Sequence, residues 1–123
     1  MTFARRPVLR LLAAAVAVAA STGVFAQSDY PNRPVKIIVP FAAGGPADNF
    51  ARVIAQHLGD ALKQPFVVED KPGAGSVIGT DSVAKSPADG YTLLLMSNTH
   101  TVNETLVPNK PFKLMTDFVG VAP

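Results

Sequence analysis

The sequence contains no cysteine, and only two of its 123 residues are histidine. Without cysteine the chain has no disulfide framework, no thiolate metal ligand and no cysteine nucleophile. The histidines, His57 and His100, have no partner at metal-ligand spacing. There is no Gly-x-Ser-x-Gly elbow and no phosphate loop ending in Lys-Ser or Lys-Thr. Enzyme chemistry therefore has no visible carrier, and we predict neither a metal nor a cofactor.

The amino-terminal segment has the three zones of a secretory signal peptide. Three arginines precede an uncharged apolar run, Leu11–Ala20, and small residues then lead to Ala26. A transmembrane anchor needs about 20 apolar residues, and this run is shorter. We therefore predict export, with residues 1–26 as the signal peptide, cleaved near Ala26, and residues 27–123 as the mature part. An arginine pair leaves the Sec and twin-arginine routes open.

Removal of this segment changes the charge balance. The whole chain has eleven Lys and Arg against nine Asp and Glu, a formal charge of +2. Three of the basic residues precede Ala26, so the mature part keeps eight basic residues against nine acidic ones. It has no basic patch interleaved with aromatic residues. We therefore expect no nucleic-acid partner.

The mature part alternates short apolar runs with helical patterns. Strands are predicted at Val35–Val39, Phe66–Glu69 and Tyr91–Met96, the third of them buried on both faces. Helices are predicted from Ala47 to about Leu62, from Val77 to about Lys85 and, more weakly, over Val102–Leu106. Strands separated by helices of this length indicate one small α/β domain with a parallel sheet and right-handed crossovers.

The first predicted helix has a defined start and an apolar stripe. Pro46 stands where the first helical residue belongs, and the carboxylate of Asp48 lies in the first turn, where the helix dipole favours it. Ser76 is predicted as the N-cap of the second helix. Asp117–Pro123 is predicted to begin a further strand, so we expect the chain to be part of a longer one. The predicted apolar stripe of the first helix comprises Phe50, Ala51, Ile54, Leu58, Ala61 and Leu62.

The special residues of the sequence gather in three loops, each of which follows a predicted strand. The carboxyl ends of parallel strands share one edge of a sheet, where ligands of open α/β sheets bind. Glycine lets backbone N–H groups approach a ligand, and helix N-termini favour negative charge. We therefore predict a site for a small anion such as a carboxylate, built from neutral donors. Its residues are Phe41, Ala42, Ala43, Gly44, Gly45, Asp48, Gly73, Ala74, Gly75, Ser76, Ser97, Asn98 and Thr99.

Other interpretations of these residues stay open. Each glycine-rich loop can be a tight turn alone. Asp48 can serve the helix dipole, accept a hydrogen bond at the floor of a pocket, or pair with a ligand ammonium. His57 is expected to be a packed or surface residue, whereas His100 is near enough to the third loop for a ligand role. The series Gly73–Gly79 approaches a dinucleotide fingerprint, although its third glycine comes one residue late. A periplasmic Rossmann-type enzyme that uses a nucleotide is therefore the alternative.

Three stretches together resemble the Bug family, also called the tripartite tricarboxylate transporter substrate-binding proteins. They are Val35–Asp48 followed by Ala51-Arg52, Val67–Gly75, and Asp89–Leu93, and Asp117-Phe118 also fits. The resemblance covers essentially all of residues 30–123. Two positions in the second loop depart from it: the family usually has Asn where Asp70 stands and Gly where Ser76 stands.

The resemblance implies a periplasmic receptor that hands a small carboxylated solute to a membrane permease. Such receptors have a flytrap fold of two Rossmann-like α/β domains, and they are far longer than this chain. Residues 27–123 would be the first part of domain 1, with the second domain absent, and we expect a monomer. The resemblance also implies that amides and ordered waters of Phe41–Gly45, with Asp48, and of Gly73–Ser76 hold the carboxylate. Ser97–Thr99 would line the cleft near the hinge. A fragment without binding function is the remaining interpretation.

Overall fold

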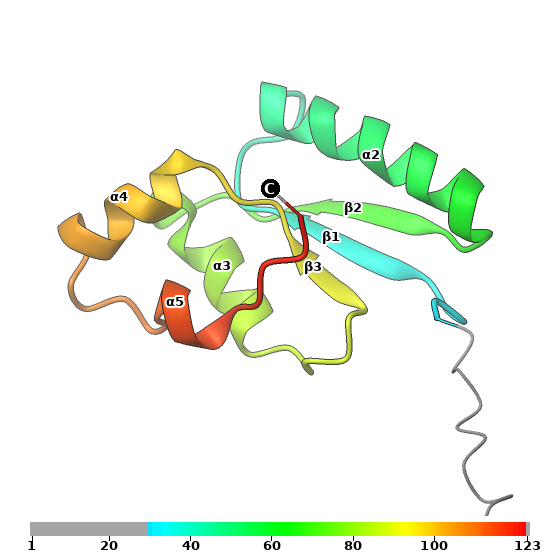
Figure 1. Cartoon of the computed structure of the whole chain (residues 1–123). Helices are drawn as coiled ribbons and strands as arrows, with labels where there is room; N and C mark the ends of the chain where they lie inside the picture. The colour runs from blue at the N-terminus through cyan, green and yellow to red at the C-terminus, as the bar shows by residue number, and fades with distance from the viewer. Residues whose placement is uncertain (1–29, 123) are drawn as a thin grey trace, which may run out of the picture. The chain divides into compact units, whose positions relative to one another are not determined.

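The computed structural model describes residues 30–122, so the predicted signal peptide lies outside the described residues. All the described helices and strands lie in one compact unit, Pro31–Pro123. None of the described helices is long and apolar enough to cross a membrane. In chain order the elements are β1 (Val35–Val39), α2 (Pro46–Leu62), β2 (Phe66–Asp70), the 3₁₀ turn η1 (Ala74–Ser76), α3 (Val77–Ala84), β3 (Thr92–Leu94), α4 (Asn98–Leu106) and α5 (Leu114–Asp117) (Figure 1).

The three strands form one parallel sheet in the order β2-β1-β3. In β1, Val39 lies opposite Asp70 of β2, and Ile38 lies opposite Leu94 of β3. The β-branched run of β1 suits its central place, where four of its five residues are buried. The predicted α/β class with a parallel sheet is confirmed. Because all three strands run the same way, the loops that leave their carboxyl ends meet at one edge.

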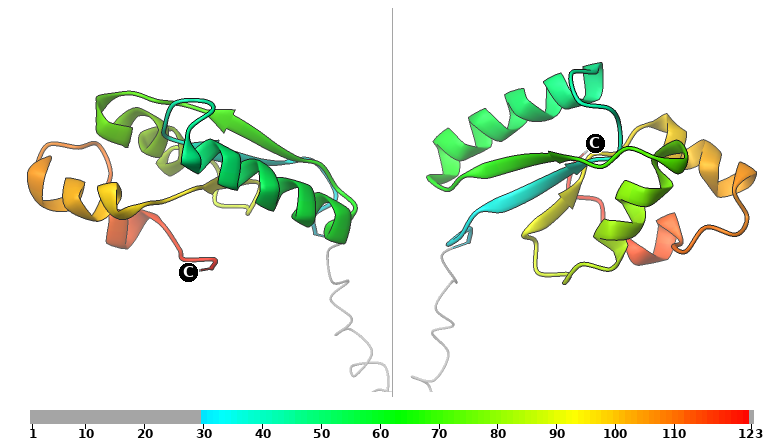
Figure 2. Two further views of the ribbon diagram at one scale, coloured as in Figure 1. Left: turned by 90° about the horizontal axis from the view of Figure 1, so that it is seen from above. Right: turned by 180° about the vertical axis from the view of Figure 1, so that it is seen from behind.

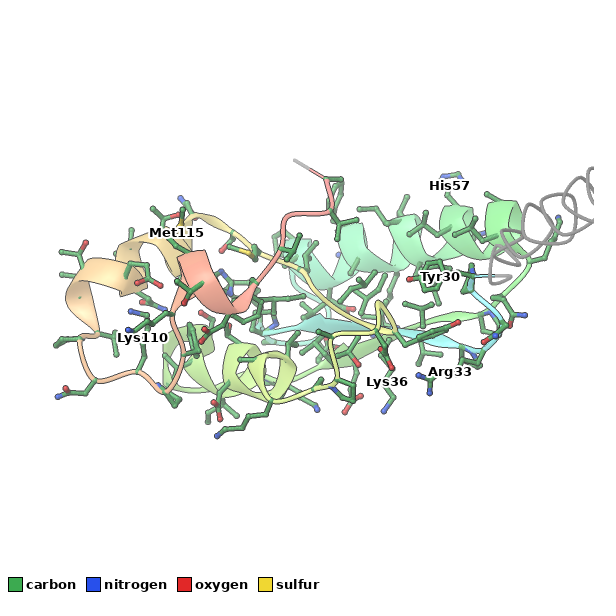
Figure 3. The ribbon with its side chains drawn as sticks, turned by 60° about the horizontal axis from the view of Figure 1, so that its bottom comes forward. Tyr30, Arg33, Lys36, His57, Lys110 and Met115 are labelled. Carbon is green, nitrogen blue, oxygen red and sulfur yellow. The ribbon has the colours of Figure 1, made fainter. Side chains whose placement is uncertain are left out.

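Helices cover the two faces of the sheet, with α2 on one face and α3 on the other (Figure 2). The core between the sheet and α2 is formed by Ile37, Val39, Ala51 and Ala55. Side chains alternate along a strand, so Ile38, which is also buried, points to the face that α3 covers. His57 lies on the outer side of α2, whereas Lys36 extends from the opposite side of the sheet (Figure 3).

The buried side of α2 differs from the predicted apolar stripe. Phe50 was expected to face the core, but 59% of its surface is exposed, and Leu62 is 43% exposed. The buried residues are Asp48, Ala51 and Ala55, which recur at i, i+3 and i+7 and so share one line along the helix. The small alanine side chains let α2 lie close to the strands. Of the predicted stripe only Ala51 is fully buried, and Ala55, which was not part of the stripe, is buried with it.

Three further predictions about secondary structure were wrong. The strand predicted over residues 91–96 is limited to Thr92–Leu94, and all three of its residues are half-buried instead of fully buried. Because β3 has only β1 beside it, its outer edge stays open within the described residues. The third predicted helix begins four residues earlier than expected, at Asn98. Asp117–Pro123 forms no strand in its described part, because Asp117 ends α5 and its Oδ2 accepts the N–H of Lys113 at 2.8 Å.

A carboxylate ties α4 to α5. Glu104 on α4 accepts the N–H of Leu114 through Oε1 at 2.7 Å, and its Oε2 pairs with Lys110 at 2.9 Å. The side chain of Lys110 is only 6% exposed and lies between the two helices (Figure 3). Its hydrogen bond, followed by that of the Leu114 amide, lowers the pKa of Glu104 below its usual value. Glu104 therefore stays ionised, and α4 is held in place at its far end.

Candidate functional site

The strand order places a topological switch point at the carboxyl end of β1. The chain moves from β1 to β2 on one side, and then crosses to β3 on the other. Loops that follow β1 and β3 therefore diverge, and such a switch point is where open α/β sheets bind their ligands. We call Phe41–Gly45 loop 1, Lys71–Ser76 loop 2 and residues 95–97 loop 3. The ring of Phe41 in loop 1 meets that of His100 edge to face, with centroids 6.0 Å apart.

Loop 1 is held from below by a buried carboxylate. The N–H of Gly44 donates to Oδ2 of Asp48 at 2.6 Å, and Asp48 is only 3% exposed. Its Oδ1 lies 2.6 Å from Nε of Arg52. A second nitrogen of the same guanidinium group, Nη2, lies 3.2 Å from Oδ2 of Asp70. Gly44 has φ +76°, a conformation that glycine adopts without strain. Both oxygens of Asp48 thus face groups of the chain itself, which favours a structural role for this carboxylate.

Loop 2 has an unusual backbone. Four successive residues have positive φ: Gly73 at 132°, Ala74 at 48°, Gly75 at 62° and Ser76 at 78°. For Ala74 and Ser76 this conformation costs on the order of 1–3 kcal/mol each. Ser76 precedes α3 as predicted, but its side chain makes no capping hydrogen bond. The left-handed backbone turns that side chain inward, where it is 3% exposed, so the predicted capping role is wrong.

Four residues of the first two loops could present backbone donors. Ala42, Ala43, Ala74 and Gly75 are exposed, and their N–H groups donate in none of the loop, turn and cap hydrogen bonds of the described residues. A backbone N–H without a partner is available to an anion, and each of the two loops has two of these residues. These four are among the residues predicted for the carboxylate site, and their role in binding stays a prediction.

Two polar side chains, one on α3 and one on α4, hold loop 2 in place. Oγ1 of Thr80 donates to the carbonyl of Ser76 at 2.8 Å, and Nδ2 of Asn103 donates to the carbonyl of Gly75 at 2.7 Å. Asn103 also donates to Oγ of Ser76 at 3.3 Å. Neither Thr80 nor Asn103 was predicted. The i, i+4 spacing from Ser76 to Thr80 is a signal that could have been used. Asn103 is 28 residues from Gly75 and gave no such signal.

Loop 3 ends at the N-cap of α4. The hydroxyl of Ser97 accepts the N–H of Thr99 at 3.3 Å, and the N–H of Ser97 donates to Nδ1 of His100 at 3.1 Å. Asn98 and Thr99 were expected to lie in a loop, but they form the first turn of α4. Asn98 is exposed and Thr99 is half-buried. A capping residue with local side-chain partners explains why this helix starts earlier than its apolar pattern suggests.

His100 is the buried centre of the site. It is 2% exposed, and its Nε2 lies 3.1 Å from Oγ1 of Thr80. Burial lowers the pKa of His100 below its usual value, because the imidazolium would lose its hydration, although the Ser97 carbonyl opposes this effect. His100 is therefore neutral at pH 7. His57, in contrast, is exposed on the outer side of α2, one of the two places expected for it.

The lowered pKa of His100 gives a pH dependence of stability. The unfolded chain binds a proton near pH 6.5 and the native state binds it only at lower pH, so the free energy of unfolding falls as pH drops through this window. We expect the melting temperature to be constant above about pH 7.5 and to fall below about pH 6.5. A His100→Gln variant should lose this part of the dependence. An identical acid profile in both proteins would contradict the prediction.

The third glycine of the series Gly73–Gly79 has a packing role. A Cβ at Gly79 would lie 2.6 Å from the carbonyl oxygen of Lys71 and 2.7 Å from Cβ of Pro40. The absence of a side chain thus lets α3 approach the ends of β1 and β2. This contact accounts for the glycine without any nucleotide.

Two hollows of the described residues lie away from the three loops. One, of about 440 Å³, lies between α2 and β2 and includes Arg52, Gln56 and Phe66, and the second lies beside α5. The described residues also contain no group of three or more acidic or histidine side chains that could hold a metal ion.

Comparison with known proteins identifies the family. The model of the tripartite tricarboxylate transporter family receptor matches residues 50–123. The chain belongs to this receptor family. BugT of Bordetella pertussis is 48% identical over 118 residues, which are 92% of this chain and 36% of BugT. A UPF0065 protein of Pseudomonas sp. strain P51 is 38% identical over 95% of this chain and 34% of its own length. The chain thus spans about a third of the length of these curated relatives.

Solved structures of similar sequence share the fold. MatC from Rhodopseudomonas palustris with bound malate has a TM-score of 0.68 and 37% identity, over 72% of this chain and 31% of MatC. An R. palustris protein with adipate has a TM-score of 0.55 and 40% identity, over 56% of this chain and 23% of that one. The resemblance to the Bug family is confirmed. The family is one of receptors and not of enzymes.

Proposed function

We propose that this chain is the amino-terminal part of a periplasmic solute-binding receptor that captures a small carboxylate for a tripartite tricarboxylate-type membrane permease. The observation that carries the proposal is the pair of adjacent loops with exposed, unpartnered amides at the carboxyl edge of the sheet. The receptor identity of the family and the malate and adipate in the structures of two relatives support it.

Charge in and around the loops fits a neutral amide site. Lys71 is the basic residue within loops 1 to 3, and its Nζ lies 3.2 Å from Oε1 of Glu69. The hydrogen bond from Lys71 lowers the pKa of Glu69, so both groups are charged and compensate each other. A carboxylate at the amides would therefore be held by dipoles and by waters that bridge to nearby groups.

The proposed site keeps the predicted residues but divides their tasks. Amides of Ala42, Ala43, Ala74 and Gly75 bind the carboxylate directly. Asp48 fixes Gly44 from the protein side. Phe41, Gly45 and Ser76 shape the two loops, and the segment Ser97–Thr99 lies at the same edge of the sheet.

The proposed domain organisation follows from the lengths of the relatives. Residues 27–123 would be the first part of domain 1 in a two-domain receptor, since the curated relatives are about three times as long as the matched segment. A second domain would close over the open loop edge and exclude water from the ligand. We propose that the complete receptor works as a monomer, without a cofactor and without catalysis, after export by its signal peptide.

A thermal-shift screen of the complete receptor tests this function. A ligand at 100 times its dissociation constant stabilises the native state by about 2.7 kcal/mol, so we expect a rise of several degrees with one class of small carboxylates. Residues 27–123 alone should show weak or no binding, because the second wall of the cleft is missing. A shift with a dinucleotide and none with any carboxylate would instead favour the nucleotide-dependent enzyme.

A further inference from the structure

A buried line of hydrogen bonds connects loop 3 to loop 2. It runs from the N–H of Ser97 to Nδ1 of His100 at 3.1 Å, from Nε2 of His100 to Oγ1 of Thr80 at 3.1 Å, and from Thr80 to the carbonyl of Ser76 at 2.8 Å. Thr80 is fully buried, and Ser76 and His100 are 3% and 2% exposed. Two segments that are distant in the sequence, residues 76–80 and 97–100, are thus joined by the buried contact between His100 and Thr80.

The bonds of this line are consistent with one tautomer of His100. With the N–H of Ser97 as the donor, Nδ1 of His100 accepts and the ring proton is on Nε2. Nε2–H then donates to Thr80, whose own hydroxyl proton goes to the carbonyl of Ser76. The carbonyl of Ser97 also lies 3.2 Å from Nδ1 and would be the acceptor if Nδ1 carried a proton. Only the neutral Nε2–H tautomer satisfies all three bonds of the line.

The line ends on the most strained part of the backbone. Ser76 is a non-glycine residue with φ +78°, and such residues persist only where neighbours hold them. Thr80 holds the carbonyl of Ser76, and Asn103 on α4 holds the carbonyl of Gly75. His100 also contacts the ring of Phe41 in loop 1. The same imidazole therefore touches or reaches all three loops.

We propose that His100, acting through Thr80, is a positioning residue that holds the left-handed backbone of loop 2 in the geometry needed for carboxylate binding. The proposal rests on the proposed function. It assigns roles to two residues that do not themselves touch the ligand: Thr80 fixes the backbone, and His100 fixes the rotamer and the proton of Thr80. Asn103 gives a second, independent hold on the same loop.

Paired substitutions separate the hydrogen bonds from the packing. Thr80→Val removes the hydroxyl at nearly constant shape, while Thr80→Ser keeps it. His100→Asn can still accept from Ser97 but cannot reach Thr80, whereas the amide of His100→Gln is placed to donate to Thr80. In the complete receptor, titrated with malate and with adipate by calorimetry, we expect Thr80→Val and His100→Asn to weaken binding about tenfold or more. Thr80→Ser and His100→Gln should stay within about threefold.

Two measurements without ligand test the positioning directly. Imidazole ¹⁵N shifts should show Nδ1 unprotonated and Nε2 protonated in the wild type. Amide hydrogen exchange in loop 2 should be about tenfold faster in Thr80→Val than in Thr80→Ser, with both proteins folded. If the wild type binds no carboxylate, the proposed function fails, and these two readouts still decide the positioning role. Folded Thr80→Val with unchanged exchange and unchanged affinity would overturn it. Should Thr80→Val not fold, His100→Asn decides by the same readouts.

Discussion

Replacement of Gly79 by alanine is expected to destabilise the protein by about 2–3 kcal/mol, the upper part of the range for overpacking. The new Cβ would lie 2.6 Å from the carbonyl oxygen of Lys71, 2.7 Å from Cβ of Pro40 and 2.9 Å from Cα of Pro40. These are backbone atoms and a proline ring, which cannot rotate away as the tip of a flexible side chain would. The start of α3 would have to move outward, and loop 2 would move with it.

The matched control is the glycine within α2. Gly59→Ala places a Cβ 3.4 Å from the carbonyl oxygen of Gln64, an ordinary contact. Because glycine in a helix is less stable than alanine, this change should stabilise the protein by about 0.5–1 kcal/mol. Urea unfolding of both variants measures the two effects. Equal and small changes at Gly79 and Gly59 would show that α3 does not lie this close to β1.

Much of the fold could be predicted because local patterns and packing agree. The run Val35–Val39 is β-branched and ends at a glycine-rich loop, and it forms the central strand within its predicted bounds. Pro46 opens α2 as expected, since its missing N–H and fixed φ suit a first helical residue. Parallel strand order then follows from the alternation of strands and helices. The errors came where tertiary packing decides, as at Phe50, which packing leaves outside because small residues face the sheet.

In the candidate site, too, local patterns could be predicted from the sequence, and tertiary contacts could not. Glycines and short polar residues after each strand predicted loops 1 and 2, which follow β1 and β2 in the structure, while the role of these loops in binding stays a prediction. The residues that hold these loops could not be found in this way. For His100 a ligand role was conceivable but no contact with Thr80 was predicted, and Asn103 is bonded to loop 2 across 28 residues of the sequence. The usual glycine at the position of Ser76 is also explained by the structure, since φ there is +78°.

Removal of the charge of Asp48 is the second change with a large expected effect. In Asp48→Asn the side chain keeps its shape, but one of its two polar atoms becomes a donor. That donor must face either the N–H of Gly44 or Nε of Arg52, both of which are donors themselves. A lost hydrogen bond to a charged group costs about 1.5–3 kcal/mol. Arg52 is more than half exposed and can regain water, so we expect a loss of about 2 kcal/mol in the free energy of unfolding.

The second effect of this substitution falls on binding, and it distinguishes a support from a contact. Gly44 lies next to the free amide of Ala43, so loosening it should weaken carboxylate binding about tenfold even where the protein is fully folded. Asp81→Asn is the control, because Asp81 and Lys85 form an ion pair in α3 with the same i, i+4 spacing, and the side chain of Asp81 is 22% exposed, against 4% for Asp48. There the change should stay within about 0.5 kcal/mol and leave affinity unchanged. If Asp48→Asn instead abolished binding while stability stayed the same, Asp48 would be a direct ligand contact. Its hydrogen bond from Gly44 and its ion pair with Arg52 would then contribute little to stability.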